Sequence, residues 1–476
     1  MPCNDTDLCY ITASEAVKEF KAKRLSPIEL LDAVIARSEH VNPQIGAYTY
    51  TFYDRAREQA RAAEKKYSTG AELRPLEGIP IVIKDFHALE GEITTYGSRI
   101  FEGVRSDYTA PTVERLLTAG AIVHARTRTP EFAHCGVCHS PLWGVTRNPW
   151  NLEYSPGGSS GGASGAVATG MTVLADGTDA GGSVRIPASA CGVFGYKPPF
   201  GRLPIDRDHP FEMMLSYGPL TRSVADAIMM ENVMAGSHIM DITSLPRIEI
   251  PHSLGGISGW KVALSMNLDY FEVDPEVDHH TSEAARVFAD LGCRVDTVKL
   301  GWSTAALDAW ETYFEGMFAG LCGELLPQWR ERMDPFLVGI IERGLAHDAA
   351  LVYRTYLVRA EMWKSLGPIL QQYDILICPT LAVPSVPADH DNANPDFQIN
   401  GRSVQAHLGW ALTYPFNLLN QLPVASIPNG IARSGVPIGL QIVGRPFNDI
   451  GVFQAAAAFE QAKPWRDVRP DRKSVV

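Results

Sequence analysis

The sequence predicts an α/β protein in which helices cover both faces of a central sheet. Two observations lead to this fold class. Short apolar runs, typical of buried strands, alternate with helical or Gly/Pro-rich segments. The runs then resume after a long helical stretch, so one interleaved domain over residues 1–476 is favoured over several independent ones. The predicted strands lie at residues 79–84, 121–126, 171–176, 374–380, 424–430 and 438–447.

Two helical regions are expected beside the sheet. The N-terminal region, about residues 12–68, contains a clear helix start at Ser26, where Pro27 suits the first helical position and Glu29 completes a capping box. The second region, about residues 302–372, places Trp, Met, Phe and Leu at helical spacing. We expect this second region to be a helical insertion that caps a site.

The composition is that of a soluble globular protein, with 45% hydrophobic and 20% charged residues and a net charge of −12. Such an acidic chain is a poor partner for nucleic acid or an anionic membrane. Residues 1–10 lack the basic and apolar regions of a secretory signal, and no uncharged run is continuous enough to span a bilayer. Eight scattered cysteines then indicate reduced thiols, and a cytoplasmic protein is expected.

The stretch at residues 155–202 is rich in glycine and serine, and three types of loop compete for it. A P-loop would need Gly-Lys-Ser/Thr at a helix start, which this stretch lacks. A nucleophile elbow, Gly-x-Ser-x-Gly, matches at Ser159 and Ser160, but no strand precedes it as that turn requires. The turn GTDAGGS, which ends at Ser183, fits better because its successive backbone N–H groups can stabilise a developing oxyanion. Ser183 is therefore the candidate nucleophile.

A serine hydroxyl needs a base within hydrogen-bond reach, and the stretch at residues 155–202 contains no histidine. A lysine can serve when burial lowers its pKa from about 10.4. Lys84 ends the apolar strand at 79–84 and is followed at once by Asp85. The same position suits a surface lysine at a strand end, so the local sequence leaves both interpretations open.

The longer pattern resembles the amidase signature family. The segments GGSSGGASGAVATG and DGTDAGGSVRIPASACGVFGYKP match the serine- and glycine-rich motif of that family almost position by position. GIPIVIKD resembles its lysine strand, and RNPWN and VPIGLQIVGRPFND are similar to further landmarks. The resemblance extends from about Leu30 to about Phe459, and so covers most of the chain.

What the resemblance implies is one α/β/α domain around a mixed, largely parallel twisted sheet, with a Ser–cis-Ser–Lys triad. Ser183 would be the nucleophile, Ser159, preceded by a cis peptide bond, the proton relay, and Lys84 the base. Backbone N–H groups of four residues would form the oxyanion hole: Ala180, Gly181, Gly182 and Ser183. Four side chains would hold the loop by hydrogen bonds: Ser160, Thr178, Asp179 and Arg185.

The chain departs from the commoner family pattern in two places. After the lysine strand it has Phe86 and His87, and residues 131–144 read EFAHCGVCHSPLWG. The CGVC segment suggests redox or zinc chemistry, but no second ligand pair accompanies it, so neither a metal nor a cofactor is expected. The resemblance places several side chains on the substrate pocket wall, with ordinary packing as the alternative for each: Ala133, His134, Cys135 and Trp410.

The expected activity is hydrolysis of a C–N bond in a small or medium amide or carbamate, such as an aryl or alkyl amide, a urethane or an oligo-amide. An acyl- or carbamoyl-serine would form on the way, and an ester side activity is expected because alkoxides leave more readily. The alternative is the glutamine-hydrolysing subunit of a tRNA-dependent amidotransferase, although YRTYLVRAEMWKSL at residues 353–366 does not follow the pattern of that branch. A non-catalytic binding protein is disfavoured because all three triad positions are present. A small-molecule substrate and a second copy in a homodimer are the expected partners.

Overall fold

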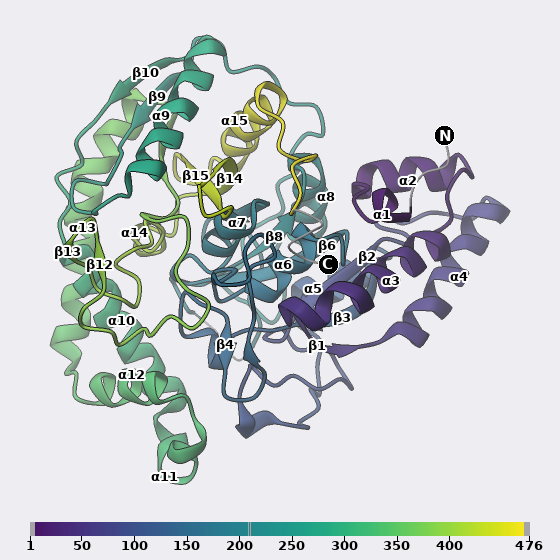
Figure 1. The fold of residues 1–476 in the computed structure, drawn as a ribbon, viewed down its shortest axis with the longest axis horizontal. Helices are drawn as coiled ribbons and strands as arrows, with labels where there is room; N and C mark the ends of the chain where they lie inside the picture. Colours follow the sequence, from purple (N-terminus) through teal and green to yellow (C-terminus); the bar gives the residue numbers. More distant parts are fainter. Residues whose placement is uncertain (1–4, 208, 210, 471–476) are drawn as a thin grey trace.

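A mixed sheet of eleven strands runs through the part of the chain that the computed structural model describes, residues 5–207, 209 and 211–470 (Figure 1). In spatial order its strands are β1 (Tyr48–Thr51), β3 (Ile122–Thr127), β2 (Pro80–Lys84), β6 (Leu174–Asp179), β8 (Ser216–Thr221), β7 (Phe194–Lys197), β14 (Val424–Ile431), β15 (Pro437–Gly444), β11 (Ile375–Pro379), β9 (Lys261–Leu264) and β10 (Arg294–Thr297). Two small hairpins lie apart from it, β4 (His139–Ser140) with β5 (Gly144–Val145) and β12 (Gln398–Ile399) with β13 (Arg402–Ser403).

The helices fall into three stretches of the chain. The first comprises α1 (Asp5–Leu8), α2 (Ala13–Lys21), α3 (Pro27–Ile45), α4 (Tyr53–Thr69) and α5 (Pro111–Thr118). The second comprises α6 (Gly161–Ala168), α7 (Arg185–Cys191), α8 (Val224–Met234) and α9 (Pro275–Asp290). The third comprises α10 (Ala305–Cys322), α11 (Leu326–Trp329), α12 (Pro335–Leu345), α13 (Ala349–Gln372), α14 (Pro415–Leu418) and α15 (Asp449–Ala462). No helix among the described residues is both long enough and apolar enough to cross a membrane.

The predicted mixed sheet flanked by helices is confirmed, and its two strand directions are unevenly distributed. Parallel pairs lie towards both ends of the sheet, as β3–β2–β6 and as β11–β9–β10. The strands between them, from β6 through β8, β7, β14 and β15 to β11, pair antiparallel, as does the edge strand β1 with β3. Because β2 and β6 are parallel neighbours, their carboxyl ends meet at one edge of the sheet.

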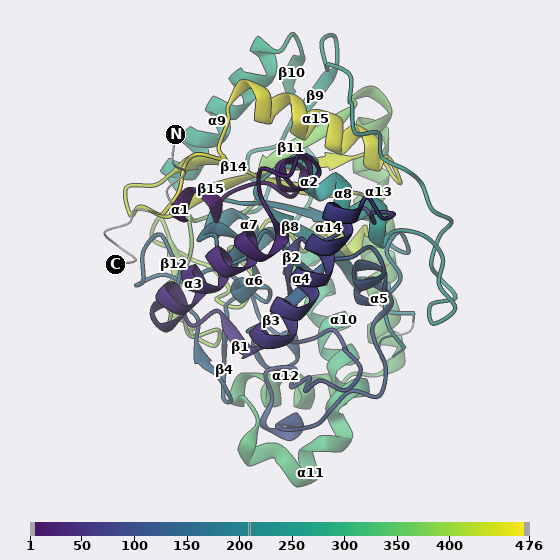
Figure 2. The same cartoon turned by 90° about the vertical axis from the view of Figure 1, so that its right-hand side faces the viewer.

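Alternation along the strands sends side chains to two different cores. On β11, Ile375 and Ile377 pack with residues of α8, α9 and α15, whereas Leu376 and Cys378 pack with residues of α10, α12 and α13. Successive strand side chains point to opposite faces, so one apolar run can fill both cores. Figure 2 agrees with this arrangement, because α15 lies above β11 and β15, and α10 and α12 lie below them.

Most elements predicted from the sequence are confirmed, with shifts of a few residues at their ends. Each of the six predicted strands overlaps a strand of the sheet, and residues 302–372 are mainly helical, as α10 to α13. The capping box at Ser26 and Glu29 begins α3 as predicted. The short edge strand β1 was not predicted and lies between α3 and α4.

Candidate active site

The site lies where β2 and β6 end side by side. Lys84 is the last residue of β2, and Asp179 is the last residue of β6. Two loops close over this edge: one precedes α6 and carries Ser159, and the other joins β6 to α7 and carries Ser183. Parallel pairing of β2 with β6 therefore brings together groups that lie up to 99 residues apart in the sequence.

The Lys84 amine is completely buried and faces three hydroxyl groups. Its Nζ lies 2.6 Å from Ser159 Oγ, 2.7 Å from Thr178 Oγ1 and 3.0 Å from Ser160 Oγ. Burial lowers the pKa of Lys84 to about 7, against the opposing charges of nearby groups that include Asp176. An amine in this state is neutral for much of the time near pH 7, and can take a proton from a hydroxyl group. The surface-lysine interpretation is thereby wrong.

Ser159 and Ser183 occupy different environments. The peptide bond between Gly158 and Ser159 is cis, and the Ser159 side chain is buried beside Lys84. Ser183 is partly exposed and lines a pocket, and its carbonyl accepts a hydrogen bond of 3.2 Å from Ser160 N–H. The two hydroxyl groups make no hydrogen bond with each other within the described residues. Catalytic hydrogen bonds commonly tighten only when substrate binds.

The turn at residues 180–183 lies at the pocket, which Ala180 and Ser183 line. Within the described residues, no acceptor binds the N–H groups of Gly181, Gly182 and Ser183. Two carbonyls of the turn are held in place by side-chain donors. Thr413 Oγ1 donates to Gly181 O at 2.6 Å, and Trp310 Nε1 donates to Ala180 O at 3.0 Å. Donors fixed in this way need little reorganisation when an oxyanion forms.

Gly182 makes this turn possible. Its φ of +126° lies in a region that favours glycine, and an added Cβ would stand 2.0 Å from Thr413 Oγ1. A side chain at this position would therefore push away the hydroxyl group that holds Gly181.

A buried ion pair holds the start of α7. Arg185 donates to both oxygens of Asp179, at 3.0 and 2.8 Å, and also to Asn417 Oδ1 at 2.7 Å and Gln441 Oε1 at 2.7 Å. Burial would raise the pKa of Asp179, but the Arg185 charge and the hydrogen bonds outweigh it and lower that pKa. The carboxylate therefore stays ionised and also accepts from Val184 N–H, which fixes the turn after Ser183.

A second buried pair, Asp176 with His87, holds the backbone at Lys84 and was not predicted. Asp176 Oδ1 accepts from the Lys84 backbone N–H at 2.7 Å, while its Oδ2 contacts His87 Nδ1. In the sequence, His87 stands out only as a departure from the family pattern. The sequence signal that could have indicated this pair was Asp176 itself, because it is an acidic residue in the apolar run at 171–176.

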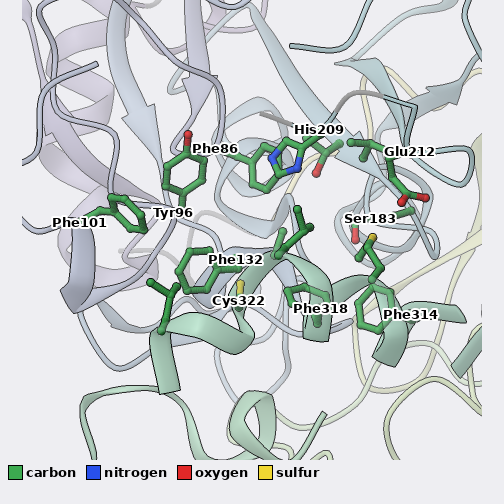
Figure 3. Close-up of a pocket in the computed structure, with 17 residues that line it drawn as sticks. Phe86, Tyr96, Phe101, Phe132, Ser183, His209, Glu212, Phe314, Phe318 and Cys322 are labelled. Atoms are coloured by element: carbon green, nitrogen blue, oxygen red, sulfur yellow. The ribbon is translucent and has the colours of Figure 1, made fainter. Parts of the chain in front are cut away.

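The pocket beside Ser183 has a volume of about 300 Å³ and mainly apolar walls. One wall is aromatic, and the other is the α10 face that carries residues 314, 317, 318 and 321, at helical spacing. Figure 3 shows Ser183 and Glu212 at one end of the pocket and Tyr96 and Phe101 at the other. The lining residues are Phe86, Tyr96, Phe101, Phe132, Ala133, Thr178, Ala180, Ser183, His209, Glu212, Leu215, Phe314, Met317, Phe318, Leu321, Cys322 and Leu325.

Of the four side chains predicted for the pocket wall, the structure places Ala133 on it, and the other three are not among the lining residues. His134 is buried, and its Nδ1 lies 2.7 Å from Glu131 O. Cys135 is buried and its thiol contacts Val137 O, and the buried Trp410 indole donates to Ala406 O at 2.9 Å. Cys135 and Cys138 are free thiols.

Known proteins are similar to this chain in both sequence and fold. The Amidase family model matches residues 29–453. An acylamidase from Rhodococcus erythropolis is 35% identical over 480 residues, with 99% of each chain covered. A glutamyl-tRNA(Gln) amidotransferase subunit from Geotalea daltonii is 32% identical, covering 97% of this chain and 99% of the relative. A solved bacterial aryl acylamidase of the amidase signature enzymes superposes with a TM-score of 0.89 at 31% identity, covering 96% of this chain and 97% of the other.

The fold, the site and these relatives define an enzyme that acts on C–N bonds. The chain belongs to the Amidase family.

Proposed function

We propose that this enzyme hydrolyses the C–N bond of small or medium amides that carry an aromatic or other bulky apolar group, by way of an acyl-Ser183 intermediate. The observation that carries the proposal is the buried Lys84 amine 2.6 Å from the Ser159 hydroxyl, next to a pocket that Ser183 lines. Carbamates, including urethanes, and oligo-amides belong to the same proposal because they share a planar carbonyl bonded to nitrogen, and an ester side activity follows from the same chemistry.

The proposed reaction begins with Lys84 as a neutral base. Ser183 Oγ attacks the carbonyl carbon and passes its proton to Ser159, which passes its own proton to Lys84. The N–H groups at residues 180–183 receive the oxyanion. When the C–N bond breaks, the proton returns through Ser159 to the leaving nitrogen, which departs as a neutral amine. Water then attacks the acyl or carbamoyl ester by the same proton route and frees Ser183.

The homologous amidotransferase subunits support a second candidate function, hydrolysis of glutamine, but the pocket argues against it. Glutamine carries an α-carboxylate, and a buried carboxylate needs a cation or several hydrogen-bond donors. Among the described lining residues there is no lysine or arginine, and Glu212 would repel that carboxylate. The apolar walls instead favour burial of an aromatic ring.

A matched substrate series tests the proposed class. We expect kcat/KM for an acetanilide to exceed that for the N-butylacetamide by at least about tenfold, because burial of the ring against aromatic walls is worth more than about 1.4 kcal/mol. Phenyl and butyl carbamates belong in the same assay, with glutamine as the competing substrate. An acyl group on the peptide that contains Ser183, detected by mass spectrometry after rapid quenching, would identify the intermediate.

Two results would count against the proposal. One is turnover of glutamine with no turnover of any anilide or carbamate, and the other is an acyl group trapped on a residue other than Ser183.

The pH dependence tests the role of Lys84. Burial lowers the pKa of Lys84 to about 7, so the base is protonated and inactive below that pH and neutral above it. We therefore expect kcat/KM to rise with pH and to level off above about 7. The negative charge of Asp176 raises the pKa of Lys84, so an Asp176→Asn variant should move the midpoint of this rise to lower pH. Asparagine keeps an acceptor for the Lys84 N–H, and an unchanged midpoint would mean that another group controls the rise.

A further inference from the structure

One carboxylate interrupts the apolar pocket. Among the described lining residues, Glu212 is the one acidic side chain, and no lysine or arginine accompanies it. It lies at the Ser183 end of the pocket, across from Phe314, so a substrate held at Ser183 passes close to it (Figure 3). Glu212 comes from the segment before β8, and the α10 wall opposite is apolar, so this acid is a candidate source of selectivity.

The fold uses only part of the hydrogen-bonding capacity of Glu212. Its Oε1 accepts from Met214 N–H at 2.9 Å, which closes the turn before β8. Its Oε2 lies 3.5 Å from the Tyr313 hydroxyl, at the outer limit of a hydrogen bond. Within the described residues no ion pair neutralises the carboxylate, and the Arg359 guanidinium acts on it only through space. An accepting oxygen is therefore still available to a ligand.

We propose that Glu212 forms a subsite for a nitrogen donor of the substrate, an ammonium or amino group carried close to the scissile carbonyl. The enzyme then favours amine-bearing amides and disfavours amides that carry a carboxylate at the same place. This inference rests on the proposed amide hydrolysis at Ser183 and adds the charge and donor character of the substrate.

Glu212 loses much of its hydration when the chain folds, before a substrate binds. Burial raises the pKa of Glu212, so the fold already bears the cost of desolvating this carboxyl group before any ligand arrives. An ammonium group that binds there is attracted by the carboxylate, and only the ammonium group still has to lose its water. When both charges of an ion pair must be desolvated together, the cost commonly cancels their attraction. A substrate carboxylate would meet a like charge in an apolar cavity, where screening is weak.

The test compares substrates that differ only in one substituent. Acetanilides with an aminomethyl, an ethyl or a carboxyl group on the ring, in the meta and in the para series, are assayed on the wild type and on Glu212→Gln. In at least one series the wild type should favour aminomethyl over ethyl by about tenfold in kcat/KM, and ethyl over carboxyl by a similar factor. In Glu212→Gln both ratios should fall towards one. Glu324→Gln removes the same charge from an exposed position just beyond α10 and should keep the wild-type ratios.

A binding experiment on the wild type keeps the inference testable if Glu212→Gln fails to fold. Ligand-observed NMR should give a dissociation constant for benzylamine at least about tenfold lower than that for phenylacetate, whether or not any amide is hydrolysed. Equal affinities, or substrate ratios that Glu212→Gln leaves unchanged, would overturn the inference. Hydrolysis of the ethyl anilide with unchanged ratios would leave the proposed function standing, whereas binding of benzylamine without hydrolysis of any anilide would leave the subsite standing alone.

Discussion

A Ser183→Ala variant is expected to lose about 10⁴-fold or more in kcat/KM on every amide that the wild type hydrolyses, because no acyl-enzyme can form without this hydroxyl group. The residual rate would come from binding and from the N–H groups of the turn, which the substitution leaves in place. Initial rates at substrate concentrations well below KM measure the effect directly.

Ser189→Ala is the matched control for this loss. Ser189 lies on α7, six residues after Ser183, and its buried hydroxyl has no hydrogen-bond partner within the described residues. Its removal should leave kcat/KM near the wild-type value. Wild-type turnover by Ser183→Ala would mean that the nucleophile lies elsewhere.

Lys84→Met should be comparably damaging, again by about 10⁴-fold in kcat/KM, because Ser159 then has no base to receive its proton. The double variant Ser183→Ala/Lys84→Met should be little worse than either single variant, since groups that act as one unit are strongly non-additive. A double variant whose loss equals the product of the two single losses would show that the two residues act independently.

Lys197 offers a contrasting buried lysine. Its Nζ donates to Asn420 Oδ1 at 2.6 Å and to Leu422 O at 2.9 Å, and within the described residues it makes no hydrogen bond to a serine hydroxyl. Lys197→Met removes a donor from each of these acceptors and leaves Asn420 Oδ1 with the Ser216 hydroxyl alone. It should therefore lower Tm by a few degrees and affect the chemistry much less than Lys84→Met does. The pair of variants separates loss of a base from loss of a structural contact.

The sequence was most informative about the helices and strands and about the turn that carries Ser183. Apolar runs located the strands because strands that are buried on both faces are mostly apolar. The glycine density of GTDAGGS indicated exposed backbone donors, and the structure leaves those donors without internal acceptors among the described residues. Lys84 is different, because Ser159 lies 75 residues away and only strand pairing brings the two together. Local sequence left a surface position open, and the family resemblance alone identified the partner.

The pocket walls were the least predictable part. They come from five separate stretches of the chain, within residues 86–101, 132–133, 178–183, 209–215 and 314–325. Helical spacing identifies the apolar face of α10 without saying what that face meets. The family resemblance placed His134 and Cys135 on the pocket wall beside Ala133, with ordinary packing as the alternative. Phe132 and Ala133 line the pocket with left-handed backbone angles, φ of +49° and +60°. The next two side chains are buried and do not line it.

The buried position of Lys84 also links unfolding to proton uptake. The pKa of this amine is about 7 in the folded chain and about 10.5 once the chain unfolds and water reaches it. Between these two values the unfolded chain carries a proton that the folded chain does not, so the contribution of Lys84 to the free energy of unfolding grows with pH across this window. Below pH 7 the folded chain must hold a charged amine away from water, and Lys84 then opposes folding most strongly. The residue that supplies the base is thus one that makes the folded protein less tolerant of acid.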